Sequence, residues 1–410
     1  MASLCSVFKN LSARRARILI PSTVRLAKGR HYCTPPDVKT EAMGFGSWLE
    51  LRHSRWPHDL SLSYSWLRDH CRCHLCYNSF TKQRVYDVCK LPLNIQPAAI
   101  KTTQEELELQ WPDGHISKYD YKFLWQNSYE GRRTSHKVPY CTWRAATFPP
   151  AHMTTIPVGD LYDPKKAGVR RVIYSIVRNG FAIISEVPAD TKSTCAAIEK
   201  VCAIKKTLFG EFWSFSEASR EHADTAYSSG FIGAHTDTTY FSQACRIQVF
   251  HCLQPAAEGG ENLLVDGFSV AEQFYNRDPK GYNFLSSEAI PSEYIEDGQC
   301  HMSLDTIFKH HQVTGQLQQF RYNMYDRAPL SSLPLEKVQE FYIHFQNLTK
   351  IIRNPKNEYW LTLEPGNVLF IDNWRVMHGR ASYQGERIMS GCYLDNDDFT
   401  SKARVLGVQL

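Results

Sequence analysis

A histidine and an aspartate stand two residues apart in the stretch GAHTDTTYF, which covers residues 233–241. Residues i and i+2 of a β-strand point to the same face, so the side chains of His235 and Asp237 can reach toward one point. A further histidine, His378, follows an apolar run in NVLFIDNWRVMHGR and precedes a glycine. Two histidines and one carboxylate form the facial triad that holds ferrous iron and leaves three coordination positions open. We therefore expect His235, Asp237 and His378 to bind Fe(II).

Arg387 begins the otherwise apolar run RIMSGCYL, nine residues beyond His378. A 2-oxo acid can fill two of the open iron positions, and its far carboxylate then needs a bidentate cation inside the protein. Most arginines lie at the surface in ion pairs, but the apolar neighbours of Arg387 argue against that position. We expect Arg387 to bind the co-substrate carboxylate.

A second group of potential ligands lies near the N-terminus, in WLRDHCRCHLCY (residues 66–77). Its three cysteines lie within six residues and are Cys71, Cys73 and Cys76. Thiolates favour zinc in a tetrahedral site, which needs one more ligand. We expect His115 to supply it, because the turn 112–114 presents this residue, while His70 and His74 remain alternatives. A closed Cys3His site of this kind is structural and has no open position for chemistry.

The first 36 residues differ from the rest of the chain in charge. They hold seven of the 47 Lys and Arg residues and no acidic residue, so 40 basic and 42 acidic residues remain beyond them. A basic, acid-free leader without a long apolar run is typical of a mitochondrial transit peptide, and we predict one over 1–36, with the mature protein in the mitochondrial matrix. A disordered basic tail is the alternative. The near-neutral remainder argues against nucleic-acid binding.

Length and composition indicate a globular protein of two domains, with 410 residues of which 43% are hydrophobic and 22% charged. No apolar run of 18 residues is present, so we expect no membrane-spanning segment. We assign a zinc-binding domain to 45–130, a linker rich in Pro and Thr to 140–158, and a catalytic domain to 159–410.

The catalytic domain shows several short β-type runs bounded by Gly, Pro or Asn. They cover residues 180–188, 245–253, 367–374 and 387–394. One amphipathic helix is predicted in PLEKVQEFYIHFQNLTKII, where apolar residues recur every three or four positions. Its expected buried face consists of Val338, Phe341, Tyr342, Phe345, Leu348 and Ile352. The fold class is therefore mainly β with covering helices: a double-sheet β-sandwich or a jelly roll.

Several motifs resemble the 2-oxoglutarate-dependent oxygenases of carnitine biosynthesis. They are HTD, GGENLLVDGF, FIDNWRVMHGRASY and GCYLDNDD, together with the N-terminal WLRDHCRC and WPDGH. The resemblance runs from about Trp66 to the C-terminus. It implies a double-stranded β-helix (jelly roll) core preceded by a small N-terminal zinc-binding β domain. It also implies iron(II) as a cofactor, 2-oxoglutarate and O2 as co-substrates, ascorbate dependence and a homodimer. Asn262 is expected near the co-substrate, where related enzymes often carry a Ser or Thr hydroxyl.

The resemblance also implies a substrate pocket with an aromatic box for a trimethylammonium group, formed by Trp213, Tyr227 and Tyr393, with Phe209 nearby. Ring faces hold such cations, which have no N–H to donate. Asp224 takes the place of an uncharged amide in the γ-butyrobetaine-binding relative, and a carboxylate there suits an α-ammonium and repels a lone carboxylate. Asn323 and Tyr325 would then hold the substrate carboxylate.

These features together predict hydroxylation of N6,N6,N6-trimethyllysine at C3, the first step of carnitine biosynthesis. The alternative substrate is γ-butyrobetaine. A non-catalytic protein that binds trimethyllysine on the same fold and a zinc-containing nucleic-acid binder are further alternatives. The intact set of His235, Asp237, His378 and Arg387 argues against the former.

Overall fold

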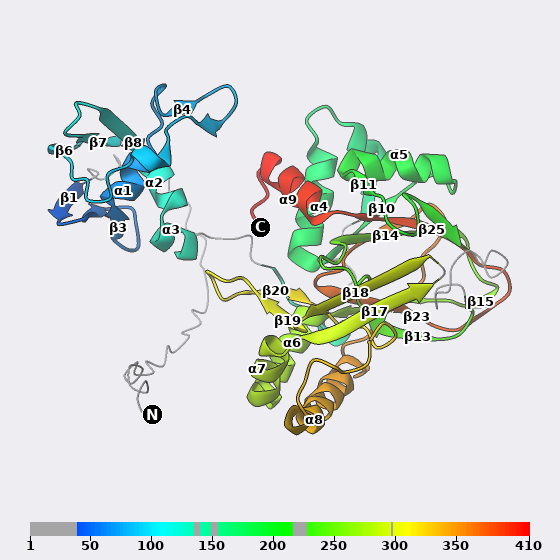
Figure 1. Cartoon of the computed structure of the whole chain (residues 1–410). Helices are drawn as coiled ribbons and strands as arrows, with labels where there is room; N and C mark the ends of the chain where they lie inside the picture. Colours follow the sequence, from blue (N-terminus) through cyan, green and yellow to red (C-terminus); the bar gives the residue numbers. More distant parts are fainter. Residues whose placement is uncertain (1–38, 135–139, 149–154, 216–227, 297) are drawn as a thin grey trace, which may run out of the picture. The chain divides into compact units, whose positions relative to one another are not determined.

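The computed structural model describes residues 39–134, 140–148, 155–215, 228–296 and 298–410 (Figure 1). The chain divides into two compact units, Met1–Leu124 and Trp125–Leu410, which are described separately. The expected transit peptide lies outside the described residues. Among the helices that are described, none is long and apolar enough to cross a lipid bilayer.

The first unit is built from short antiparallel strands. One sheet contains β1 (Thr40–Phe45), β2 (Trp48–His53) and β3 (Leu60–Ser63); another contains β6 (Ala99–Thr102), β7 (Glu106–Gln110) and β8 (Ile116–Asp120); β4 (Tyr77–Asn78) pairs with β5 (Gln83–Arg84). Helix α1 (Tyr64–Asp69) follows β3, and α2 (Tyr121–Asn127) follows β8. Alternate residues such as Leu107 and Leu109 are buried while their neighbours are not, as expected for sheets with one solvated face.

The second unit contains a seven-stranded sheet in the order β11-β25-β14-β22-β10-β9, with β12 also paired to β25. The strands are β9 (Thr155–Pro157), β10 (Phe181–Ser185), β11 (Ile204–Lys205), β12 (Trp213–Phe215), β14 (Ile247–Gln254), β22 (Val368–Asp372) and β25 (Ile388–Leu394). Each of the four runs predicted as strands contains one of them: β10, β14, β22 and β25. The sequence prediction of these strands is confirmed.

A smaller sheet has the order β13-β23-β16-β21. Its strands are β13 (Ile232–His235), β16 (Asn262–Asp266), β21 (Tyr359–Leu361) and β23 (Val376–Arg380). Three two-stranded sheets extend the unit. Two are hairpins, β17 (Ile290–Glu296) with β18 (Gln299–Asp305) and β19 (Phe308–His310) with β20 (Leu317–Phe320), and the third pairs β15 (Glu258–Gly259) with the distant β24 (Tyr383–Gln384).

Helices cover the outer faces of both sheets in the second unit (Figure 1). The helices α4 (Ala167–Asn179), α5 (Thr191–Val201) and α9 (Asn396–Val405) share a buried core with outward residues of the larger sheet, such as Val249 and Phe370. The helices α6 (Gly267–Arg277), α7 (Pro279–Ser287) and α8 (Leu335–Ile352) pack in the same way on the smaller sheet, against Leu263 and Val265. A short helix, α3 (Tyr129–Thr134), begins the unit.

The inner faces of the two sheets enclose a third core. Leu264 of the smaller sheet and Leu369 and Ile371 of the larger sheet belong to it, so neighbouring residues of one strand serve opposite layers. Strands buried on both faces are apolar throughout, which explains why these segments read as continuous apolar runs rather than alternating ones. Two facing sheets of this topology form a jelly roll with helices on both outer faces.

Two predicted features differ in detail from the structure. Helix α8 is confirmed, but Tyr342 is 40% exposed, and Ile351 is buried in its place. The stretch 140–158, expected as a linker, contributes two buried rings to the inner core of the second unit, Trp143 and Phe148. The indole of Trp143 also donates to the carbonyl of Asn179 at 2.7 Å. Its lack of periodicity therefore reflects an irregular segment that is packed, at least in part, against the sheets.

Candidate functional site

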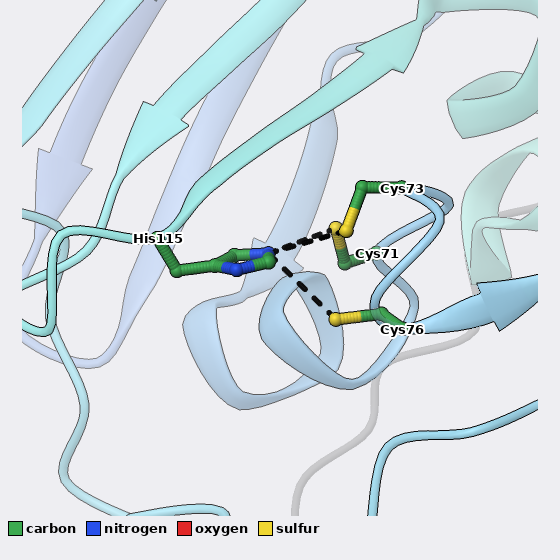
Figure 2. Close-up of side chains that lie close together, drawn as sticks. All are labelled: Cys71, Cys73, Cys76 and His115. Atoms are coloured by element: carbon green, nitrogen blue, oxygen red, sulfur yellow. Dashed lines mark hydrogen bonds between the residues drawn. The ribbon is translucent and has the colours of Figure 1, made fainter.

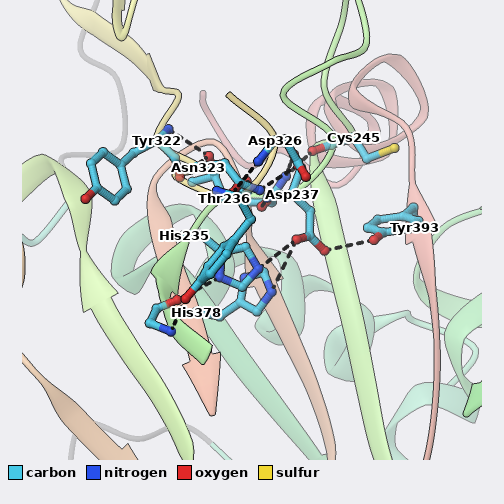
Figure 3. A network of polar contacts seen from close by, with 12 residues as sticks. His235, Thr236, Asp237, Cys245, Tyr322, Asn323, Asp326, His378 and Tyr393 are labelled. Carbon is cyan, nitrogen blue, oxygen red and sulfur yellow. Dashed lines mark hydrogen bonds and ion pairs between the residues drawn. The ribbon is translucent and has the colours of Figure 1, made fainter. Parts of the chain in front are cut away.

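The pairing of two strands brings the two candidate iron-binding histidines together. His235 is the last residue of β13, and His378 lies in β23; the antiparallel register places these two residues directly opposite each other. Their ring centroids are 4.5 Å apart. Asp237 follows β13 by two residues, and its carboxylate lies between the histidines and Tyr393 (Figure 3). One donor atom from each of the three residues lies within 4.8 Å of the others.

The carboxylate of Asp237 is ionised in this setting. Its Oδ1 lies 3.1 Å from Nε2 of His235 and 3.6 Å from Nε2 of His378, and its Oδ2 accepts a hydrogen bond of 2.8 Å from the hydroxyl of Tyr393. Burial alone would raise the pKa of Asp237, but the imidazoles and the Tyr393 hydroxyl hold it well below its ordinary value. Oδ1 of Asp237 thus faces the two histidines, while Oδ2 is held by the hydrogen bond from Tyr393.

The orientation of His235 and the protonation state of His378 both suit metal binding. Nδ1 of His235 lies 2.8 Å from the carbonyl oxygen of Gly233, which fixes the ring with Nε2 toward the cluster. Burial lowers the pKa of His378 to about 4, so this imidazole is neutral and offers a lone pair. A neutral imidazole, a carboxylate and a second imidazole with Nε2 directed at the same point are donors that suit a divalent iron.

The backbone around Asp237 is fixed by side chains from distant segments. The side-chain amide of Asn373 accepts from the Asp237 N–H at 2.7 Å and donates to the Asp237 carbonyl at 3.0 Å. Thr238 has a φ of 56°, which is unusual for a β-branched residue. Its hydroxyl accepts from the N–H of Cys245 at 2.9 Å. Such positions cost of order 1–3 kcal/mol and persist where surrounding contacts hold them, as they do here.

A cavity opens from the cluster between the two sheets. Including its mouth, it has a volume of about 840 Å³, and its wall contains His235, Asp237 and His378. Apolar walls come from Ile371 of β22 and Met389 of β25. The three donors therefore face a space that can accept small molecules, as an open metal site requires.

Arg387 lies within this cavity wall and is 5% exposed. Burial lowers the pKa of its guanidinium. Within the described part of the chain, no acidic side chain pairs with it, and its Nη2 donates a long hydrogen bond of 3.5 Å to the carbonyl oxygen of Gly260. A buried cation without a counter-charge is costly, so this position suits an anionic ligand. Asn262 also lines the cavity, from β16.

Three of the predicted aromatic residues gather on another part of the cavity wall: Phe209, Trp213 and Tyr393. The ring centroid of Tyr393 lies 6.2 Å from that of Trp213 and 6.4 Å from that of Phe209. Gly391 makes this possible, because a Cβ atom there would lie 2.3 Å from Cη2 of the indole. Tyr227 and Asp224, predicted to complete the pocket, lie outside the described residues.

The remaining predicted substrate contacts are placed differently. Both ends of the Asn323 amide are engaged: Nδ2 donates to the carbonyl of Thr236 and to Asp326, and Oδ1 accepts from the N–H of Tyr325 and of Asp326. Asn323 is absent from the cavity wall, so its role here is to hold the segment after His235. The Tyr325 hydroxyl accepts from the N–H of Gly233 at 2.8 Å, and its ring packs edge-on against His235 at 5.7 Å.

The cysteine cluster of the first unit is also assembled. Nε2 of His115 lies 3.3 Å from Sγ of Cys71 and 3.7 Å from Sγ of both Cys73 and Cys76 (Figure 2). A tetrahedron with metal–ligand bonds of about 2.0–2.3 Å has edges of roughly 3.5 Å, so this spacing fits zinc. Burial raises the pKa of Cys76 to about 11, and a bound metal would be required to keep such a thiol deprotonated.

The loops of the first unit explain why His115 is the fourth donor. Gly114 adopts a φ of 80° in the turn between β7 and β8, and the N–H of His115 donates to Asp113. His70 instead stacks on Trp66, with Nδ1 2.7 Å from the Trp66 carbonyl. His74 is exposed and lies outside the cluster. Arg68, which is 4% exposed, donates to Sγ of Cys76 at 3.3 Å.

Several residues of the site were not found from the sequence. One is Asn373, which holds the backbone of Asp237. Another feature that was missed is the hydrogen bond from the Tyr393 hydroxyl to Asp237. The others line the cavity and are Gln248, Phe250 and Arg380. Gln248 interrupts the apolar run of β14, and Asn373 directly follows the apolar strand β22, so a polar residue in or beside an apolar run is the signal that could have found both. Arg380 donates to the carbonyls of Ser228 and Gly230, a contact that no local pattern predicts.

The sequence is similar to two protein families and to several enzymes. The taurine catabolism dioxygenase TauD, TfdA family matches residues 145–393, and the gamma-butyrobetaine hydroxylase-like N-terminal family matches 49–125. The mitochondrial trimethyllysine dioxygenase of Bos taurus is 41% identical over 355 residues, which cover 85% of this chain and 84% of the relative. That of Gallus gallus is 37% identical over 405 residues, with 96% of each chain covered. The chain belongs to the TauD, TfdA dioxygenase family and groups within it with the trimethyllysine dioxygenases.

Proposed function

We propose that this protein hydroxylates N6,N6,N6-trimethyllysine at C3, using Fe(II), 2-oxoglutarate and O2. The observation that carries the proposal is one cavity whose wall holds the His235–Asp237–His378 cluster, the buried guanidinium of Arg387 and three converging aromatic rings. The relatives named above are trimethyllysine dioxygenases, which supports the substrate and a place in carnitine biosynthesis.

Different residues of the cavity would bind the metal, the co-substrate and the substrate. His235, Asp237 and His378 would hold the iron, which together with 2-oxoglutarate and O2 supplies the oxidation of an unactivated C–H bond. Arg387 would hold the far carboxylate of 2-oxoglutarate, with Asn262 beside it. Phe209, Trp213 and Tyr393 would bind the trimethylammonium group through their ring faces. The apolar walls exclude bulk water from the reacting carbon.

A product assay tests the proposal directly. The purified protein is incubated with Fe(II), 2-oxoglutarate, ascorbate and either trimethyllysine or γ-butyrobetaine, and the products are analysed by mass spectrometry. We expect trimethyllysine to gain one oxygen atom, placed at C3 by fragmentation, with succinate formed in equal amount. Faster hydroxylation of γ-butyrobetaine at equal concentration would contradict the substrate assignment.

The substrate choice rests on Asp224 as well. Its carboxylate would attract the α-ammonium of trimethyllysine, and at an effective dielectric of about 20 two like charges about 4 Å apart cost roughly 4 kcal/mol, which disfavours the lone carboxylate of γ-butyrobetaine. Asp224→Asn should therefore lower trimethyllysine turnover by about tenfold, or about 1.4 kcal/mol, and narrow the preference over γ-butyrobetaine. If this variant kept the parent's preference for trimethyllysine over γ-butyrobetaine, Asp224 would not be a substrate-binding residue.

The cysteine cluster supports a second element of the proposal, a structural zinc held by Cys71, Cys73, Cys76 and His115. All four positions of a tetrahedron are filled by protein, so this metal would take no part in oxidation. Elemental analysis of the purified protein should give about one zinc per chain that survives removal of iron. Folded protein without zinc would contradict this assignment.

We further propose the mitochondrial matrix as the location, residues 1–36 as the transit peptide, ascorbate as the reductant that keeps iron ferrous, and a homodimer as the assembly. The relatives named as mitochondrial support the organelle. Import of the full chain into isolated mitochondria with loss of the leader, and the mass of the purified protein in solution, test the location and the assembly separately.

A further inference from the structure

Gln248 is a buried polar residue of the cavity that the assignments above leave without a role. It lies in β14, in the middle of the larger sheet, and is 2% exposed. Its side-chain oxygen Oε1 is buried and has no hydrogen-bond partner among the residues that the structure describes. Leaving such an oxygen unsatisfied costs about 1–3 kcal/mol, so a sequence that keeps it needs a compensating interaction in the loaded state.

The strand register places Gln248 beside the aromatic rings. Gln248 pairs with Tyr393 on one neighbouring strand and with Ile371 on the other, and all three residues line the cavity. Directly opposed residues have Cβ atoms about 4.5–5.5 Å apart. The preceding opposed pair is Phe250 with Gly391, and it is over Gly391 that the indole of Trp213 lies. Gln248 therefore lies directly beside Tyr393, on the part of the cavity wall that carries the aromatic rings.

The same register separates Gln248 from the co-substrate end. Arg387 precedes the first residue of β25, whereas Tyr393 is the sixth residue of that strand. At about 3.3 Å per residue, the two backbone positions are roughly 20 Å apart. An amide oxygen beside Tyr393 thus faces the substrate end of the cavity. The carboxylate expected on Arg387 lies toward the opposite end.

We propose that Gln248 is a specificity residue, whose amide oxygen forms the polar wall of the aromatic pocket and faces the trimethylammonium group of the substrate. This inference rests on the proposed function. A quaternary ammonium has no N–H to donate, but its positive charge is spread over its methyl groups and attracts the negative end of an amide dipole. The ligand would thus stabilise an oxygen that no hydrogen-bond donor of the described residues reaches. A neutral group of the same shape would gain only the apolar contacts.

The experiment compares trimethyllysine with its uncharged carbon isostere, in which a tert-butyl carbon replaces the quaternary nitrogen. Binding to the iron-free protein is measured by calorimetry, so the readout needs no turnover. The parent should prefer the cation. Gln248→Met keeps the length of the side chain and removes the dipole, so it should weaken trimethyllysine binding by about three- to tenfold and leave the isostere within about twofold. Gln248→Glu, with two acceptor oxygens and a charge, should bind trimethyllysine at least as tightly as the parent.

Gln254→Met is the matched control, because Gln254 ends the same strand and is exposed outside the cavity. It should behave as the parent with both ligands. Equal losses of both ligands in Gln248→Met would show that the residue acts through packing, and a loss of 2-oxoglutarate affinity instead would place it at the co-substrate; either result overturns the inference. If the parent itself does not bind trimethyllysine, the proposed function fails, and the two failures are thereby distinguished.

Discussion

The two clusters of metal-ligating side chains in this chain differ in what surrounds them. The Cys71–Cys73–Cys76–His115 cluster has four donors at tetrahedral spacing, three of them from one short loop. The His235–Asp237–His378 cluster has three donors, two from paired strands and one just beyond the end of β13, and it opens into a cavity. A filled ligand set favours holding a fold together, whereas a missing ligand beside an enclosed space favours chemistry. The distinction lies in the number and setting of donors.

The largest effect expected from this comparison is on the fold of the first unit. Cys71→Ser removes one thiolate, and binding energy at structural zinc sites, about 10–16 kcal/mol in small domains, is folding energy. We expect loss of soluble protein, or loss of protease resistance confined to residues before Leu124. Cys89→Ser, at an exposed cysteine of the same unit, is the control and should fold normally. A soluble Cys71→Ser protein with normal protease resistance would contradict the structural role.

The second effect is on activity with the fold retained. Asp237→Ala and His378→Ala each leave two ligands, so hydroxylation should fall below about a tenth of the parent rate, since even changes to outer partners of metal ligands cost about tenfold or more. The assay uses halide-free buffer and saturating Fe(II), and thermal unfolding should show a folded protein. Asp305→Ala is a control at a surface ion pair with Lys309. Activity above that threshold in either variant would break the assignment.

Arg387→Lys sharpens the comparison at the open site. Lysine keeps the charge but loses the bidentate geometry, and hydrogen bonds to charged groups contribute about 1.5–3 kcal/mol. The KM for 2-oxoglutarate should therefore rise about ten- to a hundredfold, with binding of trimethyllysine to the iron-free protein unchanged. Arg404→Lys, in the exposed end of α9, is the control. If the substitution weakened only the binding of trimethyllysine and left the KM for 2-oxoglutarate unchanged, Arg387 would belong to the substrate pocket and the assignment would be wrong.

The smallest effect is expected for Tyr393→Phe, which removes the hydroxyl bonded to Asp237 and keeps the ring. Iron affinity should fall about tenfold, as for other outer partners of metal ligands, measured by titration under anaerobic conditions. Trimethyllysine binding should persist in Tyr393→Phe and weaken in Tyr393→Leu. Equal behaviour of the two variants would indicate that hydroxyl and ring do not have separate roles.

The sequence predicted local features better than long-range ones. The strands in 245–253 and 387–394, and the helix α8, follow from apolar patterns within single segments. The ligand sets could be proposed because residue type limits which metals they suit. The clamp of Asn373 on Asp237 could not, since it joins residues 136 positions apart through side-chain and backbone groups that have no repeating pattern. Likewise, the sequence expectation that Asn323 holds the substrate carboxylate could not include the contacts of its amide with Thr236, Tyr325 and Asp326, because these depend on how the chain folds around it.

Strand β25 and the residue before it set the distance between the parts of the cavity that are expected to bind the co-substrate and the substrate. Arg387 at one end is expected to fix the co-substrate, Tyr393 near the other end contacts Asp237, and Gly391 between them admits the indole of Trp213. A one-residue slip in a strand sends every following side chain to the opposite face, so an insertion here would remove either the anion anchor or the ring from the cavity. The length of this segment is therefore as closely constrained as the identities of Arg387, Gly391 and Tyr393.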